Sequence, residues 1–394
     1  MSREDFFRYQ APTTPFASGL EVKSAKGSII IDSNDKAYLD MVAGVSALPL
    51  GHCHLKVVDA ITKQIQSYLH VMVYGEFSQK PAVDLCKLIA ELLPDPLDMT
   101  YLVNSGTEAI EASLKLSRRV TGRSEILAMH NCYHGNTMGS LSLMDFEERK
   151  APFRPLVPGI GHIKFNCLLD LNRITTSTAA VILESIQGGA GFIVPDPRWW
   201  NALFVKCRST GTLIILDEIQ PGMGRTGSLF YFEKLGLVPD MVISGKGLGG
   251  GMPIGSLTAS TELLKQFGEH PMLGHITTFG GNPVVAAAAL ATLKEVNQNL
   301  PSFDVMVKEL RFRESLQNQH ISEVRGTGLM LAVILKNDRF TSQIVNYCRD
   351  RGVLFFLLLF EKRAIRITPP LIVEDHEIDK ACEILLEAIC YFYN

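Results

Sequence analysis

The sequence lacks the features that mark membrane, secreted and nucleic-acid-binding proteins. Its longest apolar run covers residues 353–360, whereas a helix that crosses a bilayer needs about 20 apolar residues. The first residues contain no apolar segment of the kind that forms a signal peptide. The formal net charge of −3 gives no electrostatic reason to bind nucleic acid or an acidic membrane. We therefore expect a soluble, cytoplasmic protein with no membrane or nucleic-acid partner.

Paired cysteines are also missing. The eight cysteines are scattered and form no CxxC pair, which argues against a disulfide framework or a zinc motif and suits a reducing compartment. The segment Gly51-His52-Cys53-His54 brings two histidines together, but no further ligands follow at zinc spacing. A tight turn is the favoured interpretation of this segment, and we predict no metal site.

Strands and helices alternate through the middle of the chain. Of the 394 residues, 46% are hydrophobic and 20% are charged, which is ordinary for a globular protein of two or three domains. The alternation over residues 100–260 predicts an α/β fold with a mostly parallel sheet and helices on both of its faces. We predict a large domain over residues 65–285 and a smaller α+β domain built from residues 1–64 and 286–394.

Outside the alternating region, the pattern is less regular. Residues 1–20 contain Pro12, Pro15 and Gly19 and are expected to form an arm or loop. The apolar residues 352–356 predict one strand. No internal repeat or low-complexity segment is present.

Two short apolar runs each lead to a polar residue that a buried strand would not otherwise tolerate. Asp217 ends the first run, and Lys246 comes just after the second. An open α/β sheet binds its ligand at the carboxyl ends of its strands, so an acid and an amine would meet there. Pyridoxal phosphate needs both, because a lysine binds its aldehyde and a carboxylate keeps its ring nitrogen protonated. The alternative is that Asp217 caps the next element and that Lys246 is a solvated loop residue.

A strand over residues 100–103 leads into Ser105, Gly106 and Thr107, which form a good start for a helix. Hydroxyls and free N–H groups at a helix start also make a good phosphate site, although a plain N-cap is the alternative. Tyr133 follows the strand at residues 125–129 and can stack on a flat cofactor ring, or it is a core tyrosine. Glu184 ends a further strand over residues 179–183.

Three more segments carry candidate residues. Thr277 and Thr278 lie in a polar, glycine-rich turn, where they contact a phosphate or only form the turn. Arg366 lies in an apolar, strand-like run and needs an anionic partner, which is either a substrate carboxylate or an internal acid. The glycines at 247–251 lack the GxGxxG spacing, so a Rossmann dinucleotide site is rejected.

Taken together, these motifs resemble those of the class III (ω-amino-acid type) aminotransferases, the group that contains acetylornithine, ornithine and 4-aminobutyrate aminotransferases. The resemblance covers nearly the whole chain. Its most specific motifs are Asn-Ser-Gly-Thr-Glu-Ala, Asp-Glu-Ile-Gln followed by Gly-Arg-Thr-Gly, Lys-Gly-Leu-Gly-Gly-Gly-Met-Pro-Ile-Gly, and Thr-Thr-Phe-Gly-Gly-Asn-Pro. It implies a pyridoxal phosphate enzyme of fold type I that works as a homodimer with each active site at the subunit interface.

The resemblance also implies a role for each matching residue. Lys246 carries the cofactor as an imine and transfers protons once it is freed. Asp217 pairs with the ring nitrogen, and Gln220 contacts the ring hydroxyl. The remaining implied contacts are Gly106 and Thr107 on the phosphate, Thr278 on the phosphate from the other subunit, Tyr133 stacked on the ring, Glu184 beside the cofactor, and Arg366 on a substrate carboxylate, with Asn136 and Thr277 as further candidate substrate residues.

Three positions depart from the family pattern. Asn136 stands where acetylornithine and ornithine enzymes usually carry an arginine, and Gly189 stands where several carry a glutamate that pairs with the carboxylate-binding arginine. Leu55 replaces a proline and is expected to affect only a turn. We hypothesise that Arg366 therefore stays available to α-carboxylates and that acetylornithine-like activity is weakened.

The predicted reaction moves an amino group from an amino acid or ω-amine donor to a keto acid such as 2-oxoglutarate or pyruvate. A pyridoxal phosphate-dependent aminomutase or lyase is the alternative on the same scaffold. A non-catalytic binding protein that keeps the fold is disfavoured because Lys246 is present.

Overall fold

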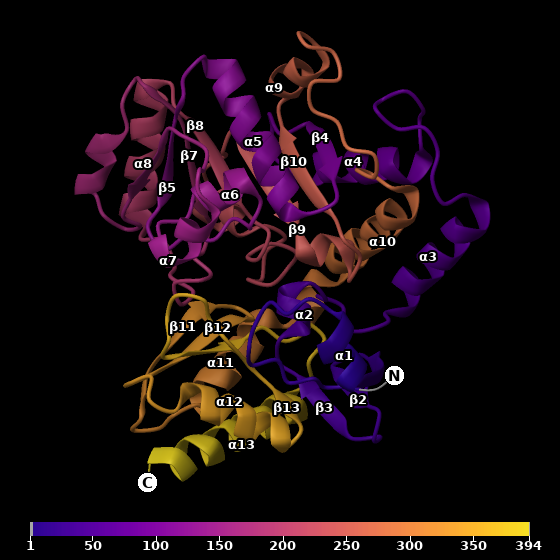
Figure 1. Ribbon diagram of the computed structural model, residues 1–394, viewed down its shortest axis with the longest axis vertical. Coiled ribbons are helices and arrows are strands. Elements are labelled where there is room, and N and C mark those ends of the chain that lie inside the picture. Colours follow the sequence, from indigo (N-terminus) through magenta and orange to yellow (C-terminus); the bar gives the residue numbers. More distant parts are fainter. Residues whose placement is uncertain (1–2, 394) are drawn as a thin grey trace.

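A seven-stranded sheet forms the centre of the larger part of the molecule, seen in the upper half of Figure 1. The computed structural model describes residues 3–393. The strands follow the order β4-β10-β9-β8-β7-β5-β6, and only β10 runs antiparallel to its neighbours. The strands are β4 (Met99–Val103), β5 (Glu125–Met129), β6 (Ile160–Ile163), β7 (Thr178–Glu184), β8 (Leu213–Asp217), β9 (Met241–Gly245) and β10 (Gly255–Ala259). The prediction of an α/β fold with a mostly parallel sheet is confirmed.

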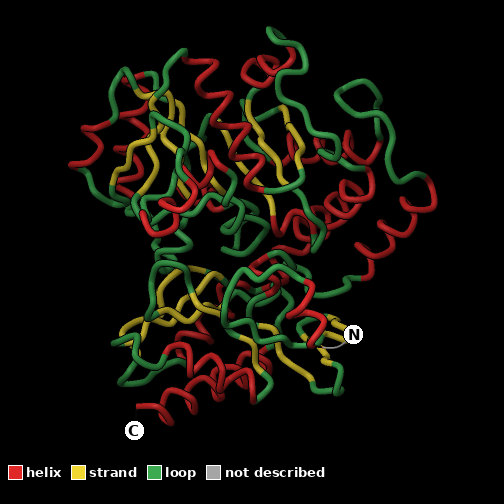
Figure 2. Tube along the Cα trace, in the orientation of Figure 1, coloured by secondary structure: helices red, strands yellow, loops and turns green. Residues whose placement is uncertain are grey.

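The central strands are continuous apolar runs because both faces of the sheet are covered. Every residue of β7 and of β9 is buried, as expected for parallel strands that helices cover on both sides. Figure 2 shows the strands of this sheet running between helices. The helices around the sheet are α3 (Leu55–Ser67), α4 (Lys80–Leu92), α5 (Gly106–Thr121), α6 (Met138–Ser142), α7 (Glu147–Lys150), α8 (Pro197–Thr210), α9 (Thr261–Leu264) and α10 (Pro283–Asn299).

Local signals set the ends of α5 and α8, two of the helices that pack on this sheet. The side chain of Ser105 caps the start of α5, and Gly122 ends it with a φ of 69°. Asp196 caps α8, and Gly211 ends it in the same left-handed conformation. These hydroxyl and carboxyl caps accept hydrogen bonds from otherwise unpaired N–H groups, and glycine adopts the left-handed region without steric cost.

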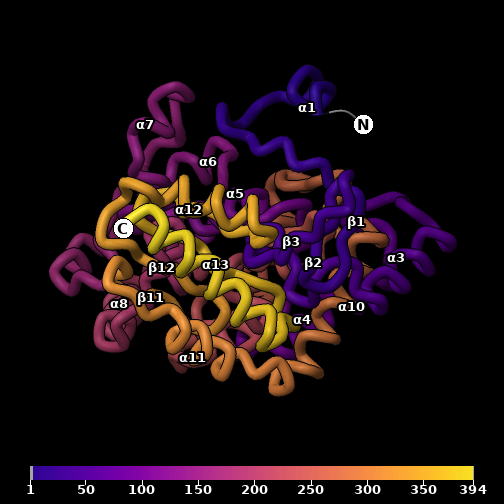
Figure 3. The backbone as a smooth tube through the Cα atoms, turned by 90° about the horizontal axis from the view of Figure 1, so that it is seen from below, coloured from indigo at the N-terminus to yellow at the C-terminus, as the bar shows by residue number. Residues whose placement is uncertain are grey.

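Both chain ends build the smaller, lower part of the molecule in Figure 1. One sheet combines the N-terminal strands β1 (Val22–Lys26), β2 (Ile29–Asp32) and β3 (Ala37–Asp40) with β13 (Val353–Leu354), which runs parallel to β3. A second, antiparallel sheet has the order β11-β12-β15-β14. Its strands are β11 (Ile321–Thr327), β12 (Met330–Leu335), β15 (Ala364–Ile367) and β14 (Phe356–Leu357). The view from below in Figure 3 shows α13 (Asp375–Tyr393), which packs against α11 (Val305–Ser315) and α12 (Thr341–Asp350).

Two expectations for the chain ends need correction. The predicted strand at residues 352–356 is two strands in different sheets, β13 and β14, because the chain crosses from one sheet to the other at Phe355. The expected N-terminal arm contains the helix α1 (Arg3–Tyr9), and none of its residues is buried. A helix without a buried face leaves no apolar periodicity in the sequence; residues 1 and 2 lie outside the described range.

The short elements complete the inventory. The 3₁₀ helices are η1 (Ala151–Phe153), η2 (Leu169–Arg173), η3 (Tyr231–Leu235), η4 (Lys246–Gly249), η5 (Lys265–Gly268) and η6 (Leu300–Phe303).

The division into domains at residues 65 and 285 stays a prediction. Within residues 3–393, no helix combines the length and the apolar composition that crossing a lipid bilayer requires.

Candidate functional site

Three polar residues lie at the carboxyl ends of adjacent strands. Glu184 is the last residue of β7 and pairs in register with Asp217, the last residue of β8. Asp217 is in turn opposite Ile243 of β9, three residues before Lys246. All three side chains line one cavity of about 490 Å³. The acid and the amine that the sequence singled out therefore share a cavity at the edge of the sheet where α/β proteins bind ligands.

Lys246 begins η4 directly after β9 and has a positive φ of 40°. A non-glycine residue in this region is strained, and such strain is typical of functional sites. Burial lowers the pKa of the Lys246 amine, and Arg366 lowers it further, whereas Asp217 acts in the opposite direction. A lowered pKa favours the neutral amine, which is the form that acts as a nucleophile.

Asp217 is held by two neighbours at the floor of the cavity. Its Oδ1 accepts a hydrogen bond from the Ile219 N–H at 3.0 Å, and its Oδ2 lies 2.7 Å from His134 Nδ1. Burial alone would lower the pKa of His134, but Cys132 and Asp217 raise it well above its ordinary value. His134 was not predicted from the sequence as a site residue, although its place directly after Tyr133 was a usable signal. The imidazole fixes the orientation of the Asp217 carboxyl group.

Glu184 connects two loops that border the cavity. Its Oε1 accepts a hydrogen bond from the Tyr133 N–H at 3.0 Å, and its Oε2 accepts one from the Gly188 N–H at 2.7 Å. The side chain is only 6% exposed. Burial raises the pKa of the Glu184 carboxyl to about 7, helped by nearby Asp217 and opposed by His134 and these two hydrogen bonds. Glu184 therefore titrates near neutral pH.

The start of α5 forms another part of the lining, through Gly106 and Thr107. A Cβ atom at position 106 would come within 2.5 Å of the end of the Ile219 side chain, so a larger residue there would displace Ile219. The Thr107 hydroxyl lies 2.7 Å from that of Thr137 and 2.6 Å from that of Ser140. The N–H groups and dipole of a 16-residue helix favour an anion at this point.

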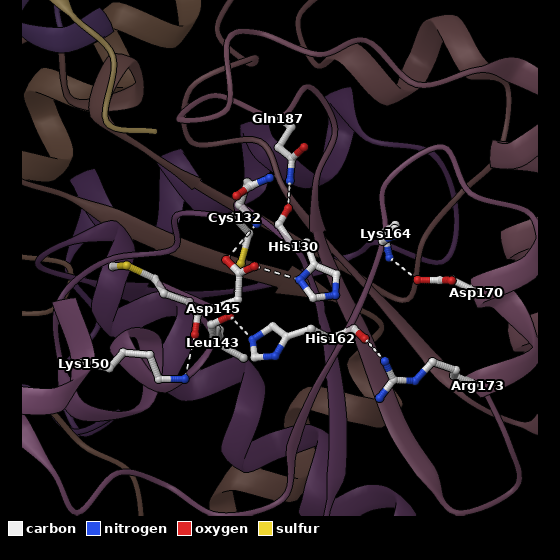
Figure 4. A network of polar contacts seen from close by, with 12 residues as sticks. His130, Cys132, Leu143, Asp145, Lys150, His162, Lys164, Asp170, Arg173 and Gln187 are labelled. Carbon is white, nitrogen blue, oxygen red and sulfur yellow. Dashed lines mark hydrogen bonds and ion pairs between the residues drawn. The ribbon is translucent and has the colours of Figure 1, made fainter. Parts of the chain in front are cut away.

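Tyr133 and Asn136 lie on the loop after β5 and line the same cavity, where Asn136 Nδ2 donates to the Tyr133 hydroxyl at 3.1 Å. Figure 4 shows the network that supports the start of this loop. Asp145 accepts from the Asn131 N–H at 2.8 Å and lies 2.7 Å from His130 Nδ1, while Gln187 donates to the His130 carbonyl. The loop is therefore tied to the segment between α6 and α7 and to the loop that follows β7.

Arg366 enters the cavity from the small antiparallel sheet. It lies in β15, between Ala332 of β12 and Phe356 of β14. The side chain is 6% exposed, its Nε has no hydrogen-bond partner in the described part of the chain, and burial lowers its pKa to about 10. A buried cation without a counter-ion is costly. The internal ion pair that the sequence left open is absent among residues 3–393, so the geometry favours an external anion.

The lining of the cavity also contains Val45, a residue that the sequence did not indicate. The short segment labelled α2 (Ala43–Ser46) has φ values of 50°, 59°, 61° and 67°, so it is a left-handed turn. A left-handed conformation costs about 1–2 kcal/mol for each non-glycine residue. This turn carries Val45 into the cavity and lets the Ser46 hydroxyl accept a 3.3 Å hydrogen bond from Gln220.

Two predicted site residues lie outside the cavity of their own chain. Thr277 Oγ1 accepts a 2.8 Å hydrogen bond from Asn104, and the Thr278 hydroxyl lies 3.3 Å from that of Tyr74. Neither residue lines the cavity. The contact of Thr278 with a cofactor in the other subunit stays a prediction.

The lining residues fit pyridoxal phosphate in their chemistry. The cavity offers a lysine amine, a buried carboxyl group, an aromatic ring and the start of a helix, which match the aldehyde, ring nitrogen, ring face and phosphate of the cofactor. The two histidines of the segment Gly51-His52-Cys53-His54 do not lie in this cavity. His52 contacts an acid elsewhere, because its Nε2 lies 2.9 Å from Asp40. In the described residues, no three His, Cys, Asp or Glu side chains are arranged to hold a metal ion.

Comparison with known proteins identifies similar chains over nearly the full length. A sequence model of the family described as Aminotransferase class-III matches residues 9–389. The acetylornithine aminotransferase of Methanopyrus kandleri is 36% identical over 371 residues, covering 92% of each chain. That of Corynebacterium efficiens is 38% identical over 380 residues, covering 93% of this chain and 91% of its own. The ornithine aminotransferase structure from Toxoplasma gondii has a TM-score of 0.91 at 28% identity and covers 100% of this chain and 96% of its own.

Proposed function

Because the chain belongs to the class III aminotransferase family, we propose that its pyridoxal phosphate-dependent transamination takes place in the cavity between Asp217 and Lys246. The observation that carries this proposal is that both residues line one cavity from adjacent strands. When bound, the cofactor supplies an aldehyde for an amine and a ring that accepts electrons.

The roles of the protein groups follow from their positions. Lys246 Nζ would hold the cofactor at its aldehyde, and the same amine would move the proton of the donor carbon that bears the amino group. Asp217, oriented by His134, would pair with the ring nitrogen of the cofactor. The other proposed contacts are Gln220 with the ring hydroxyl, Gly106 and Thr107 with the phosphate, Tyr133 with the ring face, and Glu184 beside the cofactor.

Arg366 is the proposed group that binds a substrate carboxylate. Its burial and its lack of an acidic partner among residues 3–393 support this role, because only an anion compensates such a charge. The donor is an amino acid or an ω-amine, and the acceptor is a keto acid such as 2-oxoglutarate or pyruvate. Asn136 offers no positive charge, and Gly189 offers no carboxylate to pair with Arg366, so acetylornithine- or ornithine-like activity is weakened.

A donor and acceptor screen of the purified holoenzyme tests this function. Amino donors should change the absorbance of the bound cofactor, and turnover should require an added keto acid. An aminomutase would turn over without any keto acid, and a binding protein would leave the absorbance unchanged. If acetylornithine outperforms every uncharged or cationic ω-amine, the proposed consequence of Asn136 and Gly189 is wrong.

We also propose that the chain is a homodimer with shared active sites. Exposed apolar side chains gather in two stretches, residues 65–77 and residues 272–282. The stretches contact one another through the rings of His70 and Phe279 and through a hydrogen bond from Asn282 to the Leu69 carbonyl. Thr278 lies in the second stretch, outside its own cavity, where a partner subunit could receive it. The most exposed members are Leu69 (59%), Phe77 (62%), Met272 (79%) and Phe279 (56%).

Sedimentation of the holoenzyme and of a charged variant tests the dimer. Phe77→Glu should shift the protein toward a monomer and weaken cofactor retention, because the charge cannot be buried in an apolar interface. The matched control is Val205→Glu on α8, which places the same charge at another exposed position (69%). A monomeric wild-type protein that retains full activity would contradict the proposal.

The location of the protein is inferred from its thiols. All eight cysteines are free, and four of them are buried, which suits a reducing compartment. We therefore propose that the enzyme works in the cytoplasm.

A further inference from the structure

The positive charges that face the substrate are few. Among the described residues that line the cavity, the cationic side chains without an acidic partner are Lys246 and Arg366, because the remaining basic group, His134, is paired with Asp217. If Lys246 is engaged in the reaction, as the proposed function requires, one cation remains to bind a carboxylate. A substrate with a second carboxylate would place that charge against lining residues of this chain that offer no second unpaired cation, which is costly in a partly dehydrated cavity.

The wall around Arg366 is apolar. Phe356 is directly opposite Arg366 across the antiparallel pair of β14 and β15, so the two side chains share one face of the sheet. Leu359 and Val45 also line the cavity. The exposed fractions of Phe356 (57%), Leu359 (39%) and Val45 (37%) leave apolar surface for the body of a substrate to cover.

A contact between the two parts of the molecule holds this wall in place. The Phe360 N–H donates to the Gly189 carbonyl at 3.0 Å. A Cβ atom at position 189 would come within 2.7 Å of the Phe360 ring, so the aromatic side chain occupies the space that any larger residue at 189 would need. The Phe360 ring also stacks on Phe146, with centroids 4.2 Å apart and planes 11° from parallel.

Phe146 follows Asp145, the residue that supports the start of the Tyr133 loop in Figure 4. The Phe360 contact therefore joins the wall to the loops on the floor of the site. A further cation, Arg149, lies 5.7 Å from the centroid of the Phe360 ring but is not part of the cavity lining.

We propose that the Gly189–Phe360 contact makes this site specific for 2-oxo acids with a single carboxylate and an uncharged side chain, which Arg366 binds by the carboxylate while Phe356 and Leu359 cover the side chain. This inference rests on the proposed aminotransferase function and narrows its acceptor. Pyruvate and its longer aliphatic homologues fit the lining, whereas 2-oxoglutarate leaves one carboxylate without a partner.

The first test compares acceptors on the cofactor-loaded enzyme after an amino donor has changed its absorbance. We expect pyruvate and 2-oxobutyrate to exceed 2-oxoglutarate in kcat/KM by about tenfold or more. Equal or greater efficiency with 2-oxoglutarate would overturn the inference and leave the aminotransferase function standing. An absorbance that no donor changes would instead contradict the proposed function.

The second test adds the missing charge. Leu359→Arg should raise kcat/KM for 2-oxoglutarate relative to pyruvate by about tenfold, because a second cation can pair with the second carboxylate. Leu359→Gln is the matched control and should not produce this gain. If Leu359→Arg shows no relative gain, or if Arg149→Ala abolishes an existing activity on 2-oxoglutarate, the assignment of a single-carboxylate site is wrong.

Discussion

The floor and the wall of the site are built in different ways. The floor comes from β7, β8 and β9, three adjacent buried strands that end in Glu184, in Asp217 and just before Lys246. The wall comes from the short strands β14 and β15 and from the loop between them. In the proposed site, buried strands therefore hold the groups assigned to the chemistry, while a less regular segment holds the side chains assigned to substrate selection. Mutations on the floor should therefore abolish the reaction, and mutations in the wall should redirect it.

The largest effect is expected for Lys246→Ala on the floor. The variant loses both the covalent attachment of the cofactor and the proton transfer, so turnover should fall by about 10⁴-fold or more. Circular dichroism should show a folded chain, since the side chain lies at a cavity rather than in the core. The control Lys164→Ala alters an exposed lysine and should keep its activity. Substantial turnover by Lys246→Ala would remove the basis of the assigned mechanism.

A smaller but still severe effect is expected for Asp217→Asn. The amide keeps the shape of the carboxyl group and its contacts with His134, so part of the cofactor binding should survive. Loss of the charge next to the ring should lower kcat by about 10²–10³-fold. The control is Asp338→Asn at an exposed position. A rate equal to that of the wild type would contradict the pairing of Asp217 with the ring nitrogen.

The same contrast explains what could be predicted from the sequence. The large sheet and the floor residues could be predicted because each is set by a short run of consecutive residues, such as the apolar strand that ends in Asp217. His134 was missed because its partner, Asp217, is 83 positions away. Val45 and Phe360 were missed for a related reason. Val45 reaches the cavity through a left-handed turn, and the role of Phe360 depends on Gly189, which is in a different part of the molecule.

At the contact between the wall and the loop after β7, Gly189→Ala should cause a moderate loss of substrate binding. Its Cβ atom would overlap the Phe360 ring, so the ring and the adjoining Leu359 must move. We expect KM for the keto acid to rise by about five- to tenfold while the absorbance of the bound cofactor stays the same. Gly268→Ala is the control, because apart from the adjacent residues in the chain no atom lies within 4 Å of the Cβ position there.

A double variant separates a direct contact from general damage to the wall. In Gly189→Ala combined with Phe360→Ala, the space for the new methyl group is open. The two substitutions should therefore be non-additive, with a coupling free energy of about 1 kcal/mol in kcat/KM. Strictly additive effects would show that the Gly189–Phe360 contact does not set the position of the wall.

The smallest expected effect concerns stability and returns to the floor. Burial raises the carboxyl pKa of Glu184 from 4.5 to about 7. Between these two values the folded chain holds a proton at Glu184 that the unfolded chain has released. The carboxyl group of Glu184 therefore makes the free energy of unfolding fall as pH rises through this window.

Glu184→Gln removes this titration and should change the pH dependence of unfolding by urea in the cofactor-free protein. Relative to the wild type, the variant should become more stable as pH rises from 4.5 to about 7, by at most about 1.4 kcal/mol per pH unit. Burial also raises the carboxyl pKa of Glu218 to about 7. Glu218 is unchanged in the variant, so it contributes equally to the pH dependence of unfolding in both proteins. The exposed Glu314→Gln serves as the control. If the difference in unfolding free energy between Glu184→Gln and the wild type does not vary with pH, Glu184 is not a protonated acid in the folded site near neutral pH. The floor of the site would then carry a second negative charge, beside that of Asp217.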